Sequence, residues 1–220
     1  MDFGENYRRL GSVDASQLVK RFAALPDSAW EEDTRLQEKI SFRKETRSIF
    51  LIPDGGRFPK KTLPATPLGA ALADDLEPVL AVIRRAYGER GYVTRVIATE
   101  LAANAVIPDH SALPWMRFWF VHRIHLALTT SERVTFELGG ETRHLPVGEL
   151  WEINNTRRHT VHNPSPDPRV HLVIDYATPD LVRRHRRHRL KHRFKSLRWK
   201  VRRALGLAPP PRRGGERRKR

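Results

Sequence analysis

Residues 122–176, "HRIHLALTTSERVTFELGGETRHLPVGELWEINNTRRHTVHNPSPDPRVHLVIDY", decide the fold of this chain. Apolar and polar residues alternate there in short runs, and turn-forming clusters such as "GGE", "LPVG" and "NPSPDP" separate the runs. Short alternating runs bounded by turn residues are typical of antiparallel strands. The same segment holds six of the ten histidines of the chain, so the question is what imidazoles do in a sheet.

Strand signals extend on the N-terminal side of this segment, in "VTRVIATELAA" and "RFWFVHRIHLALT". Many short strands with regular turn signals predict an antiparallel sandwich or small barrel over residues 92–178. Residues 1–91 are predicted to form a helical front with irregular connections, because residues 12–30 and 68–91 carry apolar residues at helical spacing. The prediction is a mainly β fold with flanking N-terminal helices.

The charge of the chain is concentrated at one end. The formal charge is +16, yet residues 1–182 hold 23 Lys and Arg against 24 acids, whereas residues 183–220 hold 18 against one. We therefore expect a globular domain over residues 1–182, large enough for an enzyme. Residues 183–220 should form a basic, Arg-rich extension that is partly disordered.

The composition excludes several kinds of site. The chain has no cysteine, so disulfides, thiolate zinc sites and a cysteine nucleophile are excluded, and a bound metal would need nitrogen and oxygen ligands. The N-terminus has no basic stretch followed by an apolar run, and no segment approaches the roughly 20 apolar residues of a membrane span. A cytoplasmic location is the expectation, and the sequence does not indicate the oligomeric state.

The basic extension has a pattern of its own. If "LKHRFKSLRWKVRRALG" is helical, its apolar residues form a narrow stripe on a highly cationic helix: Leu190, Phe194, Leu197, Val201 and Leu205. Such a helix could bind an anionic membrane surface, an acidic protein or nucleic-acid phosphates, or dock on the domain with its arginines in solvent.

Strand geometry sorts the histidines. Successive side chains of a strand point to opposite faces, so His125 does not share a face with His122, and His159 does not share one with His162. Neither pair is then a metal clamp, and a four-histidine zinc site is disfavoured. The better combination takes His125 and His159 from separate strands, where imidazole suits iron, zinc, copper or nickel.

An arginine that could bind a carboxylate ligand accompanies this pair of histidines. Arg169 opens "RVHLVIDY", ten residues after His159, and a guanidinium beside a metal suits a carboxylate that it grips in bidentate fashion. The remaining histidines of the segment are interpreted as structural, although His171 shares a strand face with Arg169: His122, His144, His162 and His171.

The ordered strings "RIHLAL", "GELWEINN", "HTVHN" and "RVHLVIDY" resemble the aspartyl/asparaginyl β-hydroxylase family of iron(II)- and 2-oxoglutarate-dependent oxygenases. The resemblance covers residues 105–178 and implies a double-stranded β-helix, that is, a jelly-roll or cupin-like barrel. It implies that His125 and His159 bind iron(II) and that Arg169 anchors the distal carboxylate of 2-oxoglutarate.

The resemblance also implies weaker roles and a reaction. "IPDH" places His110 near the cosubstrate or substrate, and Trp151 and Asn155 would shape the turn that presents His159. The expected reaction is hydroxylation of an aspartyl or asparaginyl side chain, in a peptide or in a small amino-acid-like substrate, with O2 consumed and succinate and CO2 formed.

Two residues depart from the common pattern of these oxygenases. The usual metal-binding acid two residues after the first histidine is replaced by Ala127; the family tolerates this, and related halogenases use the same vacancy for chloride. Glu137 stands where several members carry a basic residue, and it would repel 2-oxoglutarate unless it faces outward or pairs with Arg133 or Arg143. A metal-silent barrel that acts as a binding module through its basic tail is therefore the alternative to a hydroxylase.

Overall fold

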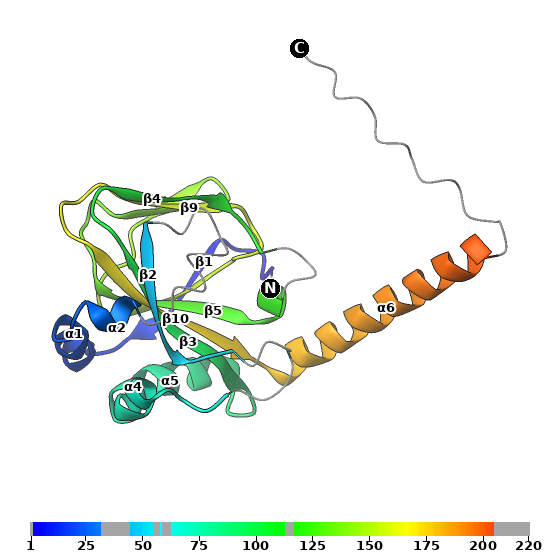
Figure 1. The fold of residues 1–220 in the computed structure, drawn as a ribbon, viewed down its shortest axis with the longest axis horizontal. Coiled ribbons are helices and arrows are strands. Elements are labelled where there is room, and N and C mark those ends of the chain that lie inside the picture. The colour runs from blue at the N-terminus through cyan, green and yellow to red at the C-terminus, as the bar shows by residue number, and fades with distance from the viewer. Residues whose placement is uncertain (1, 32–44, 55–57, 59–62, 113–116, 205–220) are drawn as a thin grey trace, which may run out of the picture. The chain divides into compact units, whose positions relative to one another are not determined.

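The computed structural model describes residues 2–31, 45–54, 58, 63–112 and 117–204. The strands of this part form two antiparallel sheets (Figure 1). The six-stranded sheet has the order β1 (Tyr7–Ser12), β8 (Glu149–Ile153), β5 (His122–Thr129), β10 (Arg169–Ala177), β3 (Tyr92–Leu101) and β2 (Thr46–Ile52). The four-stranded sheet has the order β4 (Ala105–His110), β9 (His159–Asn163), β6 (Thr135–Leu138) and β7 (Glu141–Arg143).

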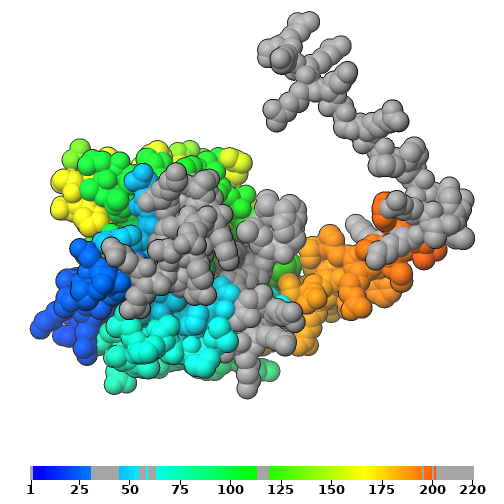
Figure 2. Space-filling model, in the orientation of Figure 1, coloured from blue at the N-terminus to red at the C-terminus, as the bar shows by residue number. Residues whose placement is uncertain are grey.

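The helices of the N-terminal half cover one face of the six-stranded sheet, and the four-stranded sheet covers the other (Figure 1). Figure 2 shows the same layering, with the cyan helices on one side of the molecule and the green and yellow strands of the smaller sheet on the other. These helices are α1 (Ser16–Ala23), α2 (Ser28–Glu31), α4 (Pro67–Ala71) and α5 (Ala73–Tyr87). The predicted mainly β jelly-roll barrel with flanking helices is thus confirmed.

Each layer boundary has its own apolar core. The larger core packs helix residues such as Leu76, Val79 and Ile83 against strand residues such as Ile124 and Leu172, all essentially buried. A smaller core lies between the two sheets: Tyr7, Leu101, Ala105, Val134, Phe136, Leu138, Leu145, Ile153 and Val161. Burial of both faces explains why β10 is buried along its whole length.

The approach of α4 to the sheet requires a glycine. A Cβ built on Gly69 would lie 2.0 Å from the carbonyl oxygen of Leu51 in β2, which is closer than atoms can pack. The turn before the helix is closed by Thr66, whose side chain accepts a hydrogen bond from the backbone N–H of Gly69. The single helix predicted over residues 68–91 is divided at Leu72 into α4 and α5, and the predicted apolar stripe is buried along α5.

The prediction of a helical front over residues 1–91 needs a correction. Two strands, β1 and β2, lie in it and form the two edges of the six-stranded sheet. Strand β1 pairs with β8, about 140 residues later in the chain. Its sequence, "YRRLGS", is polar and short, because an edge strand with a solvent-facing side needs no continuous apolar run. Likewise, "RFWF", assigned above to a strand, forms the 3-10 helix Arg117–Phe120.

The chain divides into two compact units, Met1–Val182 and Arg183–Arg220. The division falls where the charge of the sequence changes. Helix α6 (Pro179–Ala204) begins in the first unit and continues into the second. Leu205 and the C-terminal residues for which disorder is predicted lie outside the described residues. None of the described helices combines the length and apolarity needed to cross a membrane.

Candidate active site

A pocket lies between the two sheets and receives side chains from eight strands. Strand alternation explains its lining, since the lining residues within each of β3, β5, β9 and β10 are two or four positions apart. The ionisable residues of the lining are all arginines and histidines, and the others are apolar apart from two threonines. The lining residues are Thr46, Arg95, Ile97, Thr99, Ile107, His110, Arg123, His125, Phe136, Ile153, His159, Val161, Arg169 and Val173.

His159 enters the pocket from the start of β9 with a fixed tautomer. Its Nδ1–H donates to the backbone carbonyl of Arg157 at 2.9 Å, which leaves the Nε2 lone pair directed away from this bond. Burial, with a further contribution from His110, lowers the pKa of His159 to about 4. The imidazole is therefore neutral at physiological pH, which is the form that binds metals.

His125 enters the same pocket from β5 and is more deeply isolated. It is 7% exposed, and neither Nδ1 nor Nε2 has a hydrogen-bond partner among the described residues. Burial, then the nearby Arg169, holds its pKa well below the usual range. A buried imidazole with both nitrogens unsatisfied is costly, and such groups are expected where a ligand or metal binds.

No carboxylate completes this pair. Within the described ranges, no three side chains of the metal-binding types His, Cys, Asp and Glu come together. Ala127 is 1% exposed and lies two residues after His125 on the same face of β5. The donor set that the described residues offer is thus two neutral imidazoles with open positions around them.

Arg169 is buried at the start of β10 in the same pocket. It is 2% exposed, its guanidinium carbon lies 4.9 Å from the centroid of the Phe136 ring, and its Nε has no hydrogen-bond partner among the described residues. Burial lowers its pKa to about 9, so the side chain remains a cation at neutral pH. A buried cation in this position calls for an anion.

His171, interpreted from the sequence as structural, lies close to His125 and Phe136. It is 1% exposed and both of its ring nitrogens lack a hydrogen-bond partner in the part of the chain described. Its ring centroid lies 5.8 Å from that of His125 and 5.7 Å from that of Phe136. Burial and the neighbouring Arg169 keep its pKa well below the usual range, so it is a neutral donor and acceptor.

Two further arginines line the pocket and share one carboxylate. Asp175 accepts hydrogen bonds from Arg123 Nε at 2.8 Å and Nη2 at 3.0 Å, and it forms an ion pair with Arg95 Nη2 at 2.8 Å. Burial lowers the pKa of Arg95 to about 10, which still leaves it protonated. This cluster joins β3, β5 and β10 on the pocket side; alternation within each strand could have indicated it.

His110, the histidine of "IPDH", lies beside His159. Their ring centroids are 4.1 Å apart, and the Nδ1–H of His110 donates to the carbonyl of Pro108. His110 ends β4, which pairs with β9, so the two rings occupy matched positions of the smaller sheet.

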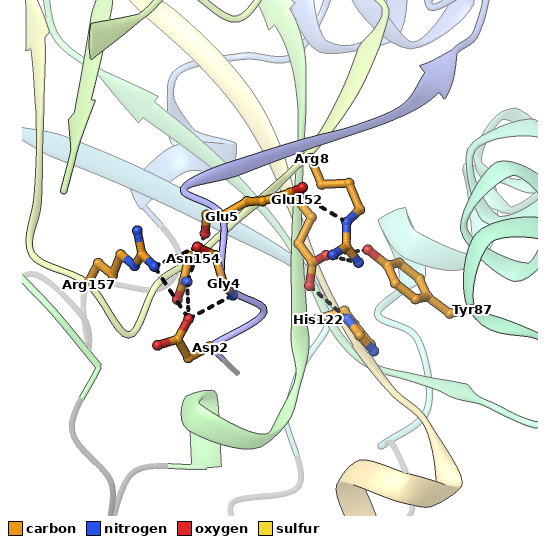
Figure 3. A network of polar contacts seen from close by, with 9 residues as sticks. All are labelled: Asp2, Gly4, Glu5, Arg8, Tyr87, His122, Glu152, Asn154 and Arg157. Carbon is orange, nitrogen blue, oxygen red and sulfur yellow. Dashed lines mark hydrogen bonds and ion pairs between the residues drawn. The ribbon is translucent and has the colours of Figure 1, made fainter. Parts of the chain in front are cut away.

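The turn before His159 is held by the N-terminal segment of the chain. The side chain of Asn154 donates to Asp2 and to the carbonyl of Glu5, and the guanidinium of Arg157 donates to the carbonyl of Gly4 (Figure 3). The same guanidinium also donates to Asn6 Oδ1. The carbonyl of Arg157 orients His159, so these contacts help to position a candidate metal ligand. No local sequence pattern indicates these contacts.

The two residues predicted to shape this turn lie in different places. Asn155 is buried in the turn, where its carbonyl accepts from the backbone N–H of Ala112. Trp151 is in β8; its indole N–H donates to Glu149, and Arg143 lies over its ring. These side-chain contacts of Trp151 are therefore with its own strand and with β7 of the smaller sheet.

Glu137 presents no obstacle to an anionic ligand. It is exposed on β6, whereas its neighbour Phe136 lines the pocket. The departure from the common pattern therefore concerns the outer face of the barrel.

The family comparison agrees with this geometry. Residues 77–179 match the family model described as Aspartyl/Asparaginyl beta-hydroxylase. The match covers 103 of the 220 residues, just under half of the chain, and agrees with the family predicted from the sequence. The predicted class, an iron(II)- and 2-oxoglutarate-dependent dioxygenase with O2 as its further cosubstrate, is confirmed at the level of the family.

Solved structures share the fold of the hydroxylase domain. An oxidoreductase of the 2OG-Fe(II) oxygenase family from Burkholderia pseudomallei has a TM-score of 0.53 at 14% identity, over 74% of this chain and 77% of that one. The non-heme monooxygenase ThoJ, solved as its nickel complex, has a TM-score of 0.51 at 13% identity, over 80% and 74%. At these identities the likeness establishes the fold alone.

Proposed function

We propose that the domain hydroxylates an aspartyl, asparaginyl or similar amino-acid side chain, peptidyl or free, with iron(II) and 2-oxoglutarate. The observation that carries the proposal is the meeting of His125, His159 and Arg169 in one pocket. Two of these three residues have buried polar atoms that the rest of the described chain leaves unsatisfied.

The residues fit iron(II). Neutral imidazoles are suitable ligands for ferrous iron, and two of them leave positions for a bidentate oxoacid, O2 and water. His159 would bind through Nε2, because its Nδ1 already donates to a carbonyl. Ala127 leaves the remaining position without a protein ligand.

The residues also fit 2-oxoglutarate. Arg169 would hold the distal carboxylate, and the side chain of His171, two residues later on the same face of β10, would donate a further hydrogen bond to the oxoacid. Phe136 and Val161 are buried in the pocket wall and would exclude water. His110, at the edge of the pocket, would contact the cosubstrate or the substrate.

The chemistry comes from the bound groups. When bound, iron(II) and 2-oxoglutarate reduce O2, so that one oxygen atom enters the substrate C–H bond and the other enters succinate, while CO2 is released. The task of the protein is placement: two imidazoles fix the metal, Arg169 fixes the oxoacid, and the pocket wall fixes the substrate carbon.

Anaerobic titration tests the site without turnover. Iron(II) is added first and 2-oxoglutarate second, while the weak visible charge-transfer band of the bidentate complex is followed. We expect the band in the wild type, no band in His159→Ala, and a roughly 30-fold higher 2-oxoglutarate requirement in Arg169→Ala, because a charged hydrogen-bond partner is lost.

Matched variants control for non-specific effects. His162→Ala removes an exposed histidine of the same strand, and Arg133→Ala removes an exposed arginine. Both should titrate like the wild type. A folded protein that binds neither iron(II) nor 2-oxoglutarate would instead favour the metal-silent binding module.

A halogenase outcome is the second candidate, and Ala127 is the observation that favours it. A buried alanine at the position of the usual carboxylate leaves room for chloride beside the metal. Turnover of a hydroxylatable substrate with and without chloride, followed by mass spectrometry, separates the two. We expect addition of oxygen under both conditions; chlorine in the product would establish the halogenase.

A further inference from the structure

The Arg-rich C-terminal unit of the chain carries a stripe of apolar side chains that is exposed to solvent. Leu190, Phe194, Leu197 and Val201 of α6 follow one another at steps of four, three and four, so they fall within about 60° of one another around the helix. Their exposed fractions are 51%, 63%, 58% and 49%. A contiguous exposed stripe of large apolar side chains is typical of an interaction surface.

Cationic side chains border this stripe on both sides. At 100° per residue, Lys191 and Arg198 fall on one flank, and Arg189 and Arg193 on the other, and all four are exposed. Residues 183–204 hold 12 Lys and Arg and no Asp or Glu. The partner must therefore be anionic where it meets the flanks and apolar where it meets the stripe.

We propose that α6 lies along an anionic lipid surface, with the four apolar side chains at the boundary between headgroups and acyl chains (orange in Figure 2). A lipid surface offers a negative layer directly above an apolar one, which matches the order of charges and apolar groups around this helix. Nucleic-acid phosphates would satisfy the arginines but leave the stripe in water. The charge density of the segment excludes a transmembrane placement.

The proposal does not rest on the proposed hydroxylase activity. It assigns a membrane-surface location to the unit that contains Arg183–Ala204, and such a location would favour substrates that are themselves at the membrane. The contact is reversible, because it relies on a few apolar side chains and on screened charge.

Vesicle co-sedimentation of the full chain is the first test. Vesicles of phosphatidylcholine alone are compared with vesicles that also contain phosphatidylserine. We expect binding to the anionic vesicles at least about tenfold tighter than to the neutral ones, and weaker binding as salt is raised. Equal binding to both vesicle types, or none to either, would overturn the proposal.

Paired variants separate the stripe from the charge. Phe194→Ser with Leu197→Ser removes half of the stripe, whereas His192→Ser with Trp199→Ser makes two changes on the opposite side of the helix. We expect the first pair to lose about tenfold in affinity for anionic vesicles and the second to lose little. Circular dichroism and urea unfolding show whether both variants keep their fold. If the two pairs lose affinity equally, the stripe is not the membrane contact.

A site-specific probe gives an independent readout, because the chain has no cysteine. An environment-sensitive fluorophore on Leu197→Cys should shift to the blue on anionic vesicles, and the same fluorophore on His192→Cys should not. A parallel titration with a duplex oligonucleotide covers the main alternative. Tighter binding to the oligonucleotide, with no shift at residue 197 on vesicles, would replace lipid with nucleic acid.

Discussion

Two histidines three residues apart on β5 lie in opposite environments. On the pocket face, both ring nitrogens of His125 lack a partner among the described residues. On the face toward α5, His122 makes a 2.7 Å contact from Nδ1 to Glu152, and the ring of Tyr87 stacks on it with centroids 3.8 Å apart (Figure 3). Both residues are 7% exposed, so burial does not distinguish them.

The difference separates stability from function. The carboxylate of Glu152, 1% exposed, also accepts from the hydroxyl of Tyr87 and lies 3.7 Å from Arg8, so β1, β5, β8 and α5 meet in one satisfied network. Such a network stabilises one arrangement of its elements. Unsatisfied groups such as those of His125 instead cost stability, and a bound ligand would recover that cost.

His125→Leu should have the largest effect on the pocket face. Leucine fills a similar volume but cannot bind a metal, so iron(II) affinity should fall by about 100-fold or more. The free energy of unfolding of the metal-free protein should change by no more than about 1 kcal/mol, because an unsatisfied imidazole is lost along with its packing. Iron(II) titration and urea unfolding measure the two quantities. Strong destabilisation without loss of iron binding would reverse the roles assigned to the two faces.

His122→Leu is the matching change on the other face. It leaves the buried Glu152 with one partner fewer, and the expected loss is about 2–3 kcal/mol in the free energy of unfolding. Iron(II) affinity at 25 °C should remain within about twofold of the wild type, since the side chain does not reach the pocket. Urea unfolding followed by circular dichroism checks the first expectation. Weak iron binding in a folded His122→Leu protein would mean that the faces are coupled.

Arg157→Ala tests whether support of the turn reaches the metal site. The Arg157 side chain donates hydrogen bonds to Gly4 and Asn6, and the backbone carbonyl of Arg157 orients His159. Loss of a group that orients a ligand typically costs about tenfold in metal affinity, which is the expected result by iron(II) titration. Arg158→Ala is the control, because this neighbouring side chain is 72% exposed. If the two variants lose iron(II) affinity equally, the loss comes from removing any positive charge near the site and not from the support of the turn.

Local alternation of side chains allowed much of the pocket to be predicted. It separated His125 from His122, and it separated His159 from His162, which is exposed. The resemblance to the hydroxylase family then selected His125, His159 and Arg169, which line one pocket. The absence of a carboxylate at Ala127 was equally visible.

Long-range pairing could not be predicted in this way. Strand β1 exists because it pairs with β8, and "YRRLGS" alone carries little strand signal. The network of Tyr87, His122 and Glu152 joins three elements that are distant in sequence, so its partners could not be known beforehand. His171 was placed on the correct face, but its lack of partners depends on what surrounds it in three dimensions.

Acid should act mainly through the pocket face and provides a graded test. The pKa of His159 is about 4 when folded and about 6.5 when unfolded, so between these values the unfolded chain binds a proton that the folded chain does not. Stability is then fully present above about pH 6.5 and falls as the pH drops toward 4, by up to about 1.4 kcal/mol per pH unit for this group. His125 and His171 shift in the same direction and add to the slope. Urea unfolding of the metal-free protein from pH 7 to pH 5 should show the fall, and His159→Gln should flatten it more than His162→Gln. If His162→Gln flattened the pH dependence of unfolding as much as His159→Gln, the acid sensitivity would not arise from the pocket histidines.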